Sequence, residues 1–344
     1  MIYRAINGTD MKVSAIGLGT WAIGGGPWWG ITDDAESIRT IHAAIDAGVN
    51  LVDTAPVYGF GKSEEVVGKA IKGRRDKVVI STKCGLWWNN VRGSFFFELD
   101  GKRVNRSLRP DTLRVEVEQS LKRLGVDCID IYHTHWQAMP PEKTPIVETM
   151  ECLLKLKTEG KIRSIAVSNA DCAQMDEYRQ AGAINANQPH YSMLDRTIET
   201  RLVPYCLKHN INLLVYSPLE QGLLTGKIGM DKKFAGSEYR NSIAWFRPEN
   251  RRRVLDMLSG WKQLVQKYNC TTAQLVLAWT ISQPGITSAL CGARHPEQIR
   301  ETAKAGGLIL ADVDRRRLRK DVEALGAPVE MNSAQNTAME ADKT

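Results

Sequence analysis

The sequence contains no apolar run that approaches the ~20 residues of a membrane-spanning helix. Its first residues, MIYRAING, do not join a basic stretch to an apolar core, so we expect no signal peptide. The seven cysteines are scattered and form no CxxC pair. This spacing argues against a disulfide framework or a zinc site and indicates reduced thiols in a cytoplasmic protein. Membrane, secreted miniprotein, collagenous and disordered classes are thereby excluded.

Charge of one sign is not in large excess, because 46 basic side chains stand against 39 acidic ones, for a net charge of +7. The two kinds are interleaved, and dense basic runs occur only at 251–253 and 315–317, in stretches with helical character. At these runs we expect solvated helix faces rather than a surface for nucleic acid or membrane. A mildly basic protein suits a small phosphate-bearing ligand at least as well.

The 344 residues suffice for one large α/β domain. Strands are predicted in eight short runs, at 14–18, 49–53, 77–83, 129–135, 162–168, 184–188, 213–217 and 287–292. Helices are predicted between them, at 33–47, 63–71, 111–124, 146–158, 172–181 and 196–209. Eight strands alternating with helices favour closure into a (β/α)8 TIM barrel over an open doubly wound sheet.

Three further elements frame this barrel. An Asn7-Gly8 turn predicts an N-terminal β-hairpin. Extra helices are expected towards the C-terminus, with the one over 271–283 packed outside the ring. We therefore expect a single domain over 1–327 and a flexible tail over 328–344. The sequence leaves the oligomeric state open.

Two long segments, 86–110 and 220–250, each separate a strand from the next helix. Insertions of this kind lie on the C-terminal rim of a barrel, where active sites are built. We expect the second to contain a mobile cover over 228–250. Near the start, Gly17–Ala22 matches G-x-G-x-x-A, but a glycine-rich loop follows instead of a helix. We interpret it as a loop lining a pocket, with Trp21 as one wall.

Four chemically coherent residues stand at strand ends. Asp53, Lys83 and His135 end three predicted strands, and Tyr58 follows the first of them in a loop. A phenol is a poor proton donor near neutrality, and an ammonium hydrogen-bonded to its oxygen would lower its pKa. Asp53 would hold Lys83, and His135 would orient a carbonyl group. Such a set moves a proton to or from a carbonyl oxygen. The hydride that reduction also requires must come from a cofactor.

These residues belong to a series of motifs: Asp53-Thr-Ala-x-x-Tyr58-Gly, Ser81-Thr-Lys83, DIYHTHW around His135, GKIRSIAVSN at 160–169, QPHYS from Gln188, and YSPL with GLLTGK at 216–227. In this order the series resembles the aldo-keto reductase superfamily, in particular a bacterial branch with GLGTWAIGG near its start and GAR near its end. The resemblance implies an NADPH-dependent carbonyl reductase. The aromatic residues of the segment 86–110 and of the early loop suit a sugar-derived or other small polar aldehyde or ketone, and equally an aromatic one.

Carried over by position, the resemblance makes Tyr58 the general acid, tuned by Lys83 and Asp53, with His135 orienting the carbonyl. Cofactor-binding positions are Gly19, Thr20, Trp21, Asp53, Ser168, Asn169, Gln188, Tyr216, Ser217, Leu219, Gly222, Leu224, Lys227, Gly292, Ala293, Arg294, Gln298 and Thr302. Of these, Ser168, Asn169 and Gln188 would hold the nicotinamide carboxamide, and Tyr216 would stack on its ring. The positions from Ser217 to Lys227 would line the loop beside the pyrophosphate, and those from Gly292 to Thr302 would bind the adenosine and its 2′-phosphate. Substrate-binding positions are Trp21, Tyr58, Trp88, His135 and Trp136.

Several features depart from the family pattern or stay open. His133 shares a strand face with His135, and Gln137 and Thr302 replace residues that are common in the family. The arginines and lysines of the two rim segments would suit an anionic substrate, which the sequence does not decide. The alternatives to an NADPH-dependent reductase are a regulatory or redox-sensing NADPH-binding barrel with vestigial turnover and, third, a phosphate-binding barrel isomerase or lyase.

Overall fold

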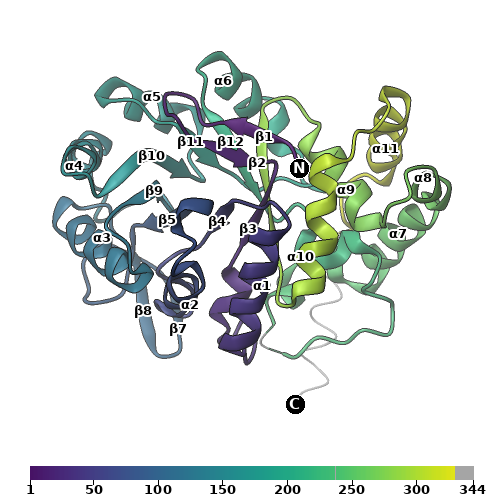
Figure 1. Cartoon of the computed structure of the whole chain (residues 1–344), viewed down its shortest axis with the longest axis horizontal. Helices are drawn as coiled ribbons and strands as arrows, with labels where there is room; N and C mark the ends of the chain where they lie inside the picture. Colours follow the sequence, from purple (N-terminus) through teal and green to yellow (C-terminus); the bar gives the residue numbers. More distant parts are fainter. Residues whose placement is uncertain (237, 330–344) are drawn as a thin grey trace.

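The computed structural model describes residues 1–236 and 238–329, and its centre is a closed barrel of parallel strands (Figure 1). Going round the barrel, the strands are β3 (Ile16–Gly19), β4 (Leu51–Asp53), β5 (Val79–Cys84), β9 (Ile129–Thr134), β10 (Ile162–Ser168), β11 (Ala186–Gln188), β12 (Asn212–Tyr216) and β13 (Ile286–Gly292), which pairs with β3 again. The predicted (β/α)8 barrel is therefore confirmed.

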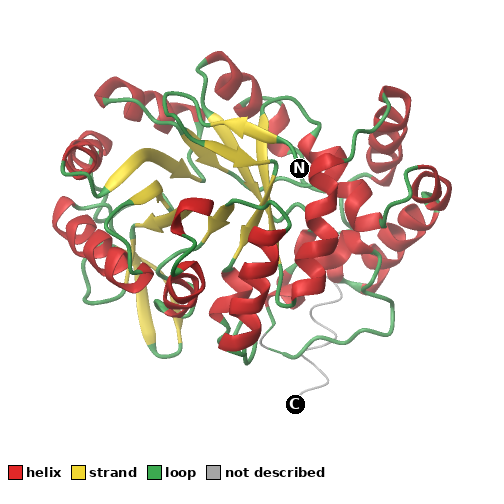
Figure 2. Ribbon diagram, in the orientation of Figure 1, coloured by secondary structure: helices red, strands yellow, loops and turns green. Residues whose placement is uncertain are grey.

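Helices cover the outside of this barrel (Figure 2). The first six are α1 (Asp34–Asp46), α2 (Lys62–Ile71), α3 (Pro110–Leu124), α4 (Ile146–Thr158), α5 (Cys172–Ala181) and α6 (Leu202–Lys208). Local signals set their ends: α3 starts on a proline and stops at Gly125, whose φ is 65°. A capping box between Asp171 and Gln174 starts α5. The helix predicted over 196–209 is shorter than expected, since 197–199 forms a separate 3-10 turn.

The N-terminal hairpin closes one end of the barrel. Strands β1 (Tyr3–Ala5) and β2 (Lys12–Ser14) pair antiparallel, and Gly8 in their turn has a φ of 73°. The hairpin contributes Ile6, Met11 and Val13 to a buried cluster with residues near the start of the barrel strands, among them Leu51. The predicted hairpin thus plugs the N-terminal end, and chemistry is left to the other rim.

The segment 86–110 contains strands that the sequence analysis did not predict. It forms a three-stranded sheet of β6 (Leu86–Trp87), β8 (Lys102–Arg106) and β7 (Ser94–Leu99), with β8 in the middle. Its tight turn is Asp100-Gly101, where both residues have positive φ. The segment lies between β5 and α3, as predicted, and the Asp-Gly pair is a hairpin signal that we did not use.

The C-terminal part corrects another expectation. It contains α7 (Pro248–Ser259), α8 (Lys262–Lys267), α9 (Thr272–Ile281), α10 (Pro296–Ala303) and α11 (Asp312–Leu325). The helix predicted at 271–283 exists as α9, but it contacts β13 and every one of its residues from Ala273 to Ile281 is buried. It is therefore the ring helix between β12 and β13, and α7 and α8, inserted before it, are extra helices.

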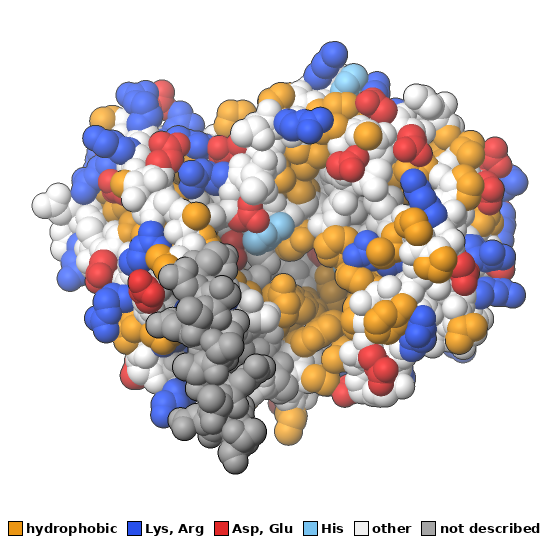
Figure 3. Space-filling view, turned by 180° about the vertical axis from the view of Figure 1, so that it is seen from behind, with side chains coloured by type: hydrophobic (Ala, Val, Ile, Leu, Met, Phe, Trp, Pro, Cys, Tyr) orange, Lys and Arg blue, Asp and Glu red, His pale blue; other side chains and the backbone are white. Residues whose placement is uncertain are grey.

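Basic and acidic side chains are interspersed over the face drawn in Figure 3. The expectation that residues 251–253 lie on a solvated helix face is wrong for Arg251. This side chain is buried and donates to the backbone oxygens of Met230 and Lys232. Among residues 1–236 and 238–329, no helix combines the length and apolar character needed to cross a membrane. The tail expected over 328–344 lies outside the described residues except for Pro328 and Val329.

Candidate active site

A buried ion pair lies inside the C-terminal end of the barrel. Asp53 ends β4, Lys83 lies on the neighbouring strand β5, and Lys83 Nζ is 2.6 Å from Asp53 Oδ1. The lysine side chain has no exposed surface and that of the aspartate 5%. Lys83 Nζ also donates to the backbone oxygen of Thr54 at 2.8 Å. The ammonium is thus fixed in position by two acceptors from the β4 end.

Further donors surround the same carboxylate. Asp53 Oδ2 accepts from Ser81 Oγ at 2.7 Å and from Gln188 Nε2 at 2.8 Å. Ser81 Oγ is in turn 3.0 Å from His133 Nε2, and His133 Nδ1 is 3.3 Å from the Val167 oxygen. His133 is therefore a packed histidine that supports Ser81, and burial lowers its pKa to about 4, so the ring is neutral.

Tyr58 and His135 lie at the mouth beside this pair. Lys83 Nζ is 5.3 Å from the centre of the Tyr58 ring, and the rings of Tyr58 and His135 meet edge to face with centroids 5.9 Å apart. Both side chains are partly exposed. A Cβ on Gly24 would come within 2.7 Å of the Tyr58 carbonyl carbon, so glycine is needed where the early loop crosses Tyr58. The structure brings the four predicted residues together at one rim.

The protonation of this group differs from our expectation. Burial and the negative charge of Asp53 raise the pKa of the Tyr58 phenol well above its ordinary value. The expected hydrogen bond from Lys83 to the phenol is replaced here by its bonds to Asp53 and Thr54. Burial also lowers the pKa of His135 well below its usual value. In the free protein near pH 7, Tyr58 is therefore a protonated phenol next to a neutral imidazole.

A second set of polar side chains continues along the rim to β12. Asn169 Nδ2 donates to the His135 backbone oxygen at 3.1 Å, and Asn169 Oδ1 accepts from Tyr216 Oη at 2.9 Å. Ser168 Oγ donates to the backbone oxygen of Gln188 at 2.8 Å. The residues predicted for the nicotinamide carboxamide thus adjoin His135 through Asn169 and Asp53 through Gln188, and Tyr216, predicted for the ring, adjoins Asn169.

The loop predicted to run beside the pyrophosphate has an unusual backbone. Ser217, Glu220, Gln221 and Gly222 all have positive φ. At the end of the loop, Lys227 Nζ pairs with Glu301 on α10 at 2.5 Å. The remaining predicted positions here differ in exposure, since Leu219 is partly exposed, whereas the Leu224 side chain is fully buried in the core. A ligand would reach Leu224 only through its backbone.

Arg294 connects the predicted adenosine-binding region to the early loop. Its guanidinium donates to the backbone oxygens of Trp29 at 3.1 Å and Ile31 at 2.7 Å. Gln298 Oε1 accepts from the Arg294 amide, and the Thr302 hydroxyl donates to the Gln298 oxygen. Gly292 is exposed and a Cβ there would touch nothing, whereas Ala293 is buried. Arg294 must give up or share its carbonyl partners in order to bind a phosphate.

Aromatic side chains surround the mouth on the side of Tyr58. The Trp21 ring contacts four others, with centroid distances of 5.6 Å to Trp28, 5.1 Å to Trp29, 6.3 Å to Tyr58 and 5.6 Å to Tyr239. Gly19 ends β3, and the Thr20 hydroxyl before Trp21 donates to the Asp53 backbone oxygen at 2.9 Å. Because Tyr239 belongs to the segment 220–250, that segment reaches the pocket wall.

The other predicted wall residues, Trp88 and Trp136, also lie near Tyr58. Trp88 contacts Phe60 and Trp136 contacts Phe96, at centroid distances of 5.3 and 5.5 Å. Tyr58, Phe60, Trp88, Phe96, Phe97 and Trp136 all pack against one small hydrophobic cluster of Ala55, Val57, Leu86 and Val104. The β6–β8 sheet therefore builds the second wall of the mouth.

Sequence reasoning did not assign Ser81 or His190. Strand alternation offered a signal for Ser81, because it stands two residues before Lys83 and so faces the same interior. His190 is stacked on Tyr216 with centroids 5.3 Å apart and planes at 23°. Its Nδ1 is 3.0 Å from Asp195 Oδ2 and its Nε2 is 3.1 Å from Glu220 Oε1. His190 thus connects the β11 end, Tyr216 and the loop with positive φ.

This position makes stability depend on pH. Burial alone would lower the pKa of His190, but the carboxylates of Asp195 and Glu220 outweigh it and raise the pKa to about 9. A raised pKa stabilises the fold fully below pH ~6.5, and this contribution is lost as the pH rises through about 9. We expect His190→Gln to remove at most about 3 kcal/mol of pH-dependent unfolding free energy over that range.

Urea unfolding at pH 6, 7.5 and 9.5 would measure this contribution. The control is His209→Gln, since the His209 pKa is lowered and its ring packs on Tyr205, away from this loop. We expect the gap in unfolding free energy between wild type and His190→Gln to shrink with rising pH. The gap for His209→Gln should not shrink, because a lowered pKa makes a histidine contribute least to stability at low pH. A gap for His190→Gln that is constant from pH 6 to 9.5 would contradict the assigned imidazolium.

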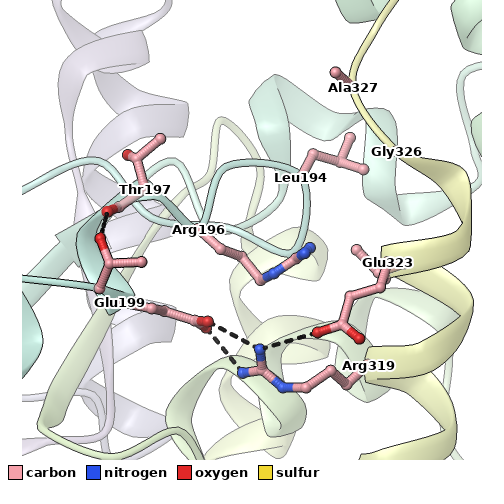
Figure 4. Close-up of a pocket in the computed structure, with 10 residues that line it drawn as sticks. Leu194, Arg196, Thr197, Glu199, Arg319, Glu323, Gly326 and Ala327 are labelled. Atoms are coloured by element: carbon pink, nitrogen blue, oxygen red, sulfur yellow. Dashed lines mark hydrogen bonds and ion pairs between the residues drawn. The ribbon is translucent and has the colours of Figure 1, made fainter.

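A separate surface depression of about 440 Å³ lies between residues 194–200 and α11 (Figure 4). Arg319 in it binds both carboxylate oxygens of Glu199, at 2.8 and 2.9 Å, and is 3.7 Å from Glu323. Its main charges are therefore paired. None of the predicted site residues lines this depression.

Comparison with known proteins gives consistent matches over the barrel. The family model described as Aldo/keto reductase family matches residues 15–320. The chain is 47% identical over 319 residues to an Escherichia coli protein named "NADH-specific methylglyoxal reductase", covering 92% of this chain and 97% of that protein. The solved glycerol dehydrogenase of Gluconobacter oxydans is 38% identical with a TM-score of 0.84, covering 96% of this chain and 98% of its own. An aldo-keto reductase of Klebsiella pneumoniae, solved in complex with NADPH, is 28% identical with a TM-score of 0.71 and the same coverage.

Proposed function

Because the chain belongs to the aldo/keto reductase family, we propose that it reduces a small aldehyde or ketone to the alcohol with NADPH, using Tyr58 as proton donor. The family resemblance expected from the motifs is confirmed by the match over 15–320. The observation that carries the assignment of the acid is the juxtaposition of Tyr58, Lys83 and His135 at one rim. Nothing comparable lines the depression of Figure 4.

The donor set at the rim fits a nicotinamide nucleotide. Asn169 and Ser168 present amide and hydroxyl groups beside His135, and the Tyr216 ring lies next to them. In the neighbouring loop, the buried Oε1 of Gln221 has no hydrogen-bond partner among the described residues, which suits a hydroxyl or amide donor from a ligand. When bound, NADPH supplies the hydride from nicotinamide C4.

The chain's own residues then control the proton. Tyr58 carries its proton near pH 7, and its raised pKa keeps that proton on the phenol until negative charge develops on the substrate. His135, a neutral imidazole, can donate a hydrogen bond to the substrate carbonyl and aim it at Tyr58. As negative charge develops on the carbonyl oxygen, that oxygen becomes a stronger base than a phenolate and takes the Tyr58 proton. The Lys83 charge, 5.3 Å from the ring centre, stabilises the phenolate that remains.

The cofactor proposal depends on Arg294. A guanidinium binds a phosphate through two parallel hydrogen bonds, which favours NADPH over NADH. Arg294 presents two such donors, although both contact loop carbonyl oxygens in the free protein. The Klebsiella structure contains NADPH, whereas the Escherichia coli relative is named NADH-specific. We therefore propose that NADPH is preferred over NADH to the extent that Arg294 exchanges its loop carbonyl partners for the phosphate.

A fluorescence titration with both nucleotides, followed by a carbonyl screen, tests this function. We expect the reduced nucleotides to bind, NADPH more tightly than NADH, and absorbance of NADPH to fall when small polar aldehydes are added. Binding of NADPH without turnover of any aldehyde would favour the regulatory or redox-sensing barrel instead. Failure of both nucleotides to bind would contradict the proposal and favour a phosphate-binding isomerase or lyase.

We further propose that residues 1–327 form one domain that works in the cytoplasm on a small-molecule partner. The scattered cysteines, which are all free thiols, support a reducing compartment. The interspersed surface charges support the absence of a nucleic-acid or membrane partner.

A further inference from the structure

Arg106 lies in the wall of the mouth in an unusual setting. It ends β8, the central strand of the β6–β8 sheet. Its guanidinium carbon is 3.9 Å from the centre of the Phe96 ring and 4.8 Å from that of Trp136. Two aromatic faces thus hold the cation in place, and this contact orients it without neutralising its charge.

The charge of Arg106 has no counter-ion in the described parts of the chain. The ion pairs of residues 1–236 and 238–329 are made by other arginines, by lysines and by histidines, and the Arg106 Nε is buried without a hydrogen-bond partner. Burial also lowers the pKa of Arg106. Leaving a desolvated guanidinium unpaired costs free energy that an added anion would recover. A half-buried arginine without a carboxylate partner therefore favours the binding of an anionic ligand.

The same wall places Arg106 close to the reacting group. Trp136 directly follows His135 in the chain, and Phe96 and Trp136 pack with Tyr58 against the cluster of Ala55, Val57, Leu86 and Val104. The Trp136 ring, on which the Arg106 guanidinium is stacked, thus connects Arg106 to the position of His135. A substrate held between Tyr58 and His135 that extended along Trp136 would bring its far end to Arg106.

We propose that Arg106 binds an anionic group on the substrate, so that the preferred substrates are aldehydes or ketones carrying a carboxylate or a phosphate. The planar fork of a guanidinium recognises both groups through paired hydrogen bonds. This inference rests on the proposed carbonyl reduction. It narrows the substrate class from small polar carbonyls to anionic ones.

Matched substrate pairs test the inference. Succinic semialdehyde and butanal have the same chain length and differ in a terminal carboxylate, and glyceraldehyde phosphate and glyceraldehyde differ in a phosphate. We expect wild type to favour the charged member of at least one pair in kcat/KM. Arg106→Met should lower that charged-to-neutral ratio by about 10- to 100-fold, mainly through a higher KM, because one charge-assisted contact is lost.

Arg103→Met is the control, since Arg103 stacks on Phe95 at 4.6 Å from the same strand but is exposed and bonds Asn105. It removes an equal charge and should keep the wild-type ratio. Arg106→Lys, which keeps the charge without the fork, should retain part of the preference and also serves if Arg106→Met does not fold. Which pair responds shows whether the anion is a carboxylate or a phosphate.

The outcomes separate the two proposals. A wild-type enzyme that reduces the neutral aldehydes with no preference for either charged partner overturns the role of Arg106 and leaves carbonyl reduction standing. The same conclusion follows if Arg106→Met lowers kcat/KM equally for both members of a pair. It also follows if Arg103→Met changes the charged-to-neutral ratio as much as Arg106→Met does. Absence of turnover with all four carbonyls in the presence of bound NADPH contradicts the proposed function itself.

Discussion

Tyr58→Phe is expected to lower kcat for aldehyde reduction by about 10²- to 10⁴-fold while NADPH binding stays within a few-fold of wild type. The substitution removes only the phenolic oxygen, so the ring contacts with Trp21 and His135 remain. Without that oxygen, no acid stands beside the carbonyl when negative charge develops on it. The kcat from NADPH oxidation and the Kd from fluorescence titration measure the two quantities separately.

Tyr216→Phe provides the matched control for this experiment. It makes the same chemical change at the same rim, where Tyr216 Oη donates to Asn169 Oδ1 at 2.9 Å. We expect its main effect on nucleotide affinity, because the hydroxyl orients Asn169 and does not touch the proton path. Near-normal rates of Tyr58→Phe with several aldehydes would refute Tyr58 as the acid.

Much of the fold could be predicted from local patterns. Short β-branched runs alternating with amphipathic stretches predicted the barrel, and its strand ends predicted where Asp53, Tyr58, Lys83 and His135 would meet. These signals are local and periodic, so one sequence suffices to find them. The hairpin turn at Asp100-Gly101 also has a local signal, which we did not use.

The interactions between distant residues could not be predicted in this way. Gln188 donates a hydrogen bond to Asp53, 135 positions away in the chain, and no local sequence pattern links the two residues. The hydrogen bonds of Lys83 show the same limit. Its ammonium donates to the Thr54 backbone oxygen instead of the Tyr58 phenol, and this depends on the position of the backbone, not on the type of residue. The sequence of α9 is apolar on all sides, and its residues from Ala273 to Ile281 are all buried. This pattern does not distinguish a ring helix from a helix packed outside the ring. Arg106 became informative only when the absence of a partner among the described residues was visible.

Lys83→Met is expected to reduce both stability and turnover strongly. It leaves the Asp53 carboxylate buried with Ser81 and Gln188 as its remaining side-chain donors. Breaking a buried pair by removing one partner costs about 3–5 kcal/mol, because the other charge stays uncompensated. Turnover should fall as well, since Lys83 no longer stabilises the Tyr58 phenolate. Urea unfolding and kcat at saturating NADPH measure the two effects.

The double variant Lys83→Met/Asp53→Asn separates these roles. Removing both charges leaves no unpaired ion, so unfolding free energy should recover by about 2 kcal/mol or more relative to Lys83→Met alone, while kcat stays low. Arg114→Met is the surface control, because its pair with Glu159 at 2.9 Å is about 40% exposed on both sides and should cost at most about 1 kcal/mol. If the double variant regained turnover together with stability, Lys83 would act only on the fold, and the Tyr58 phenolate would have to be stabilised by another group at the rim.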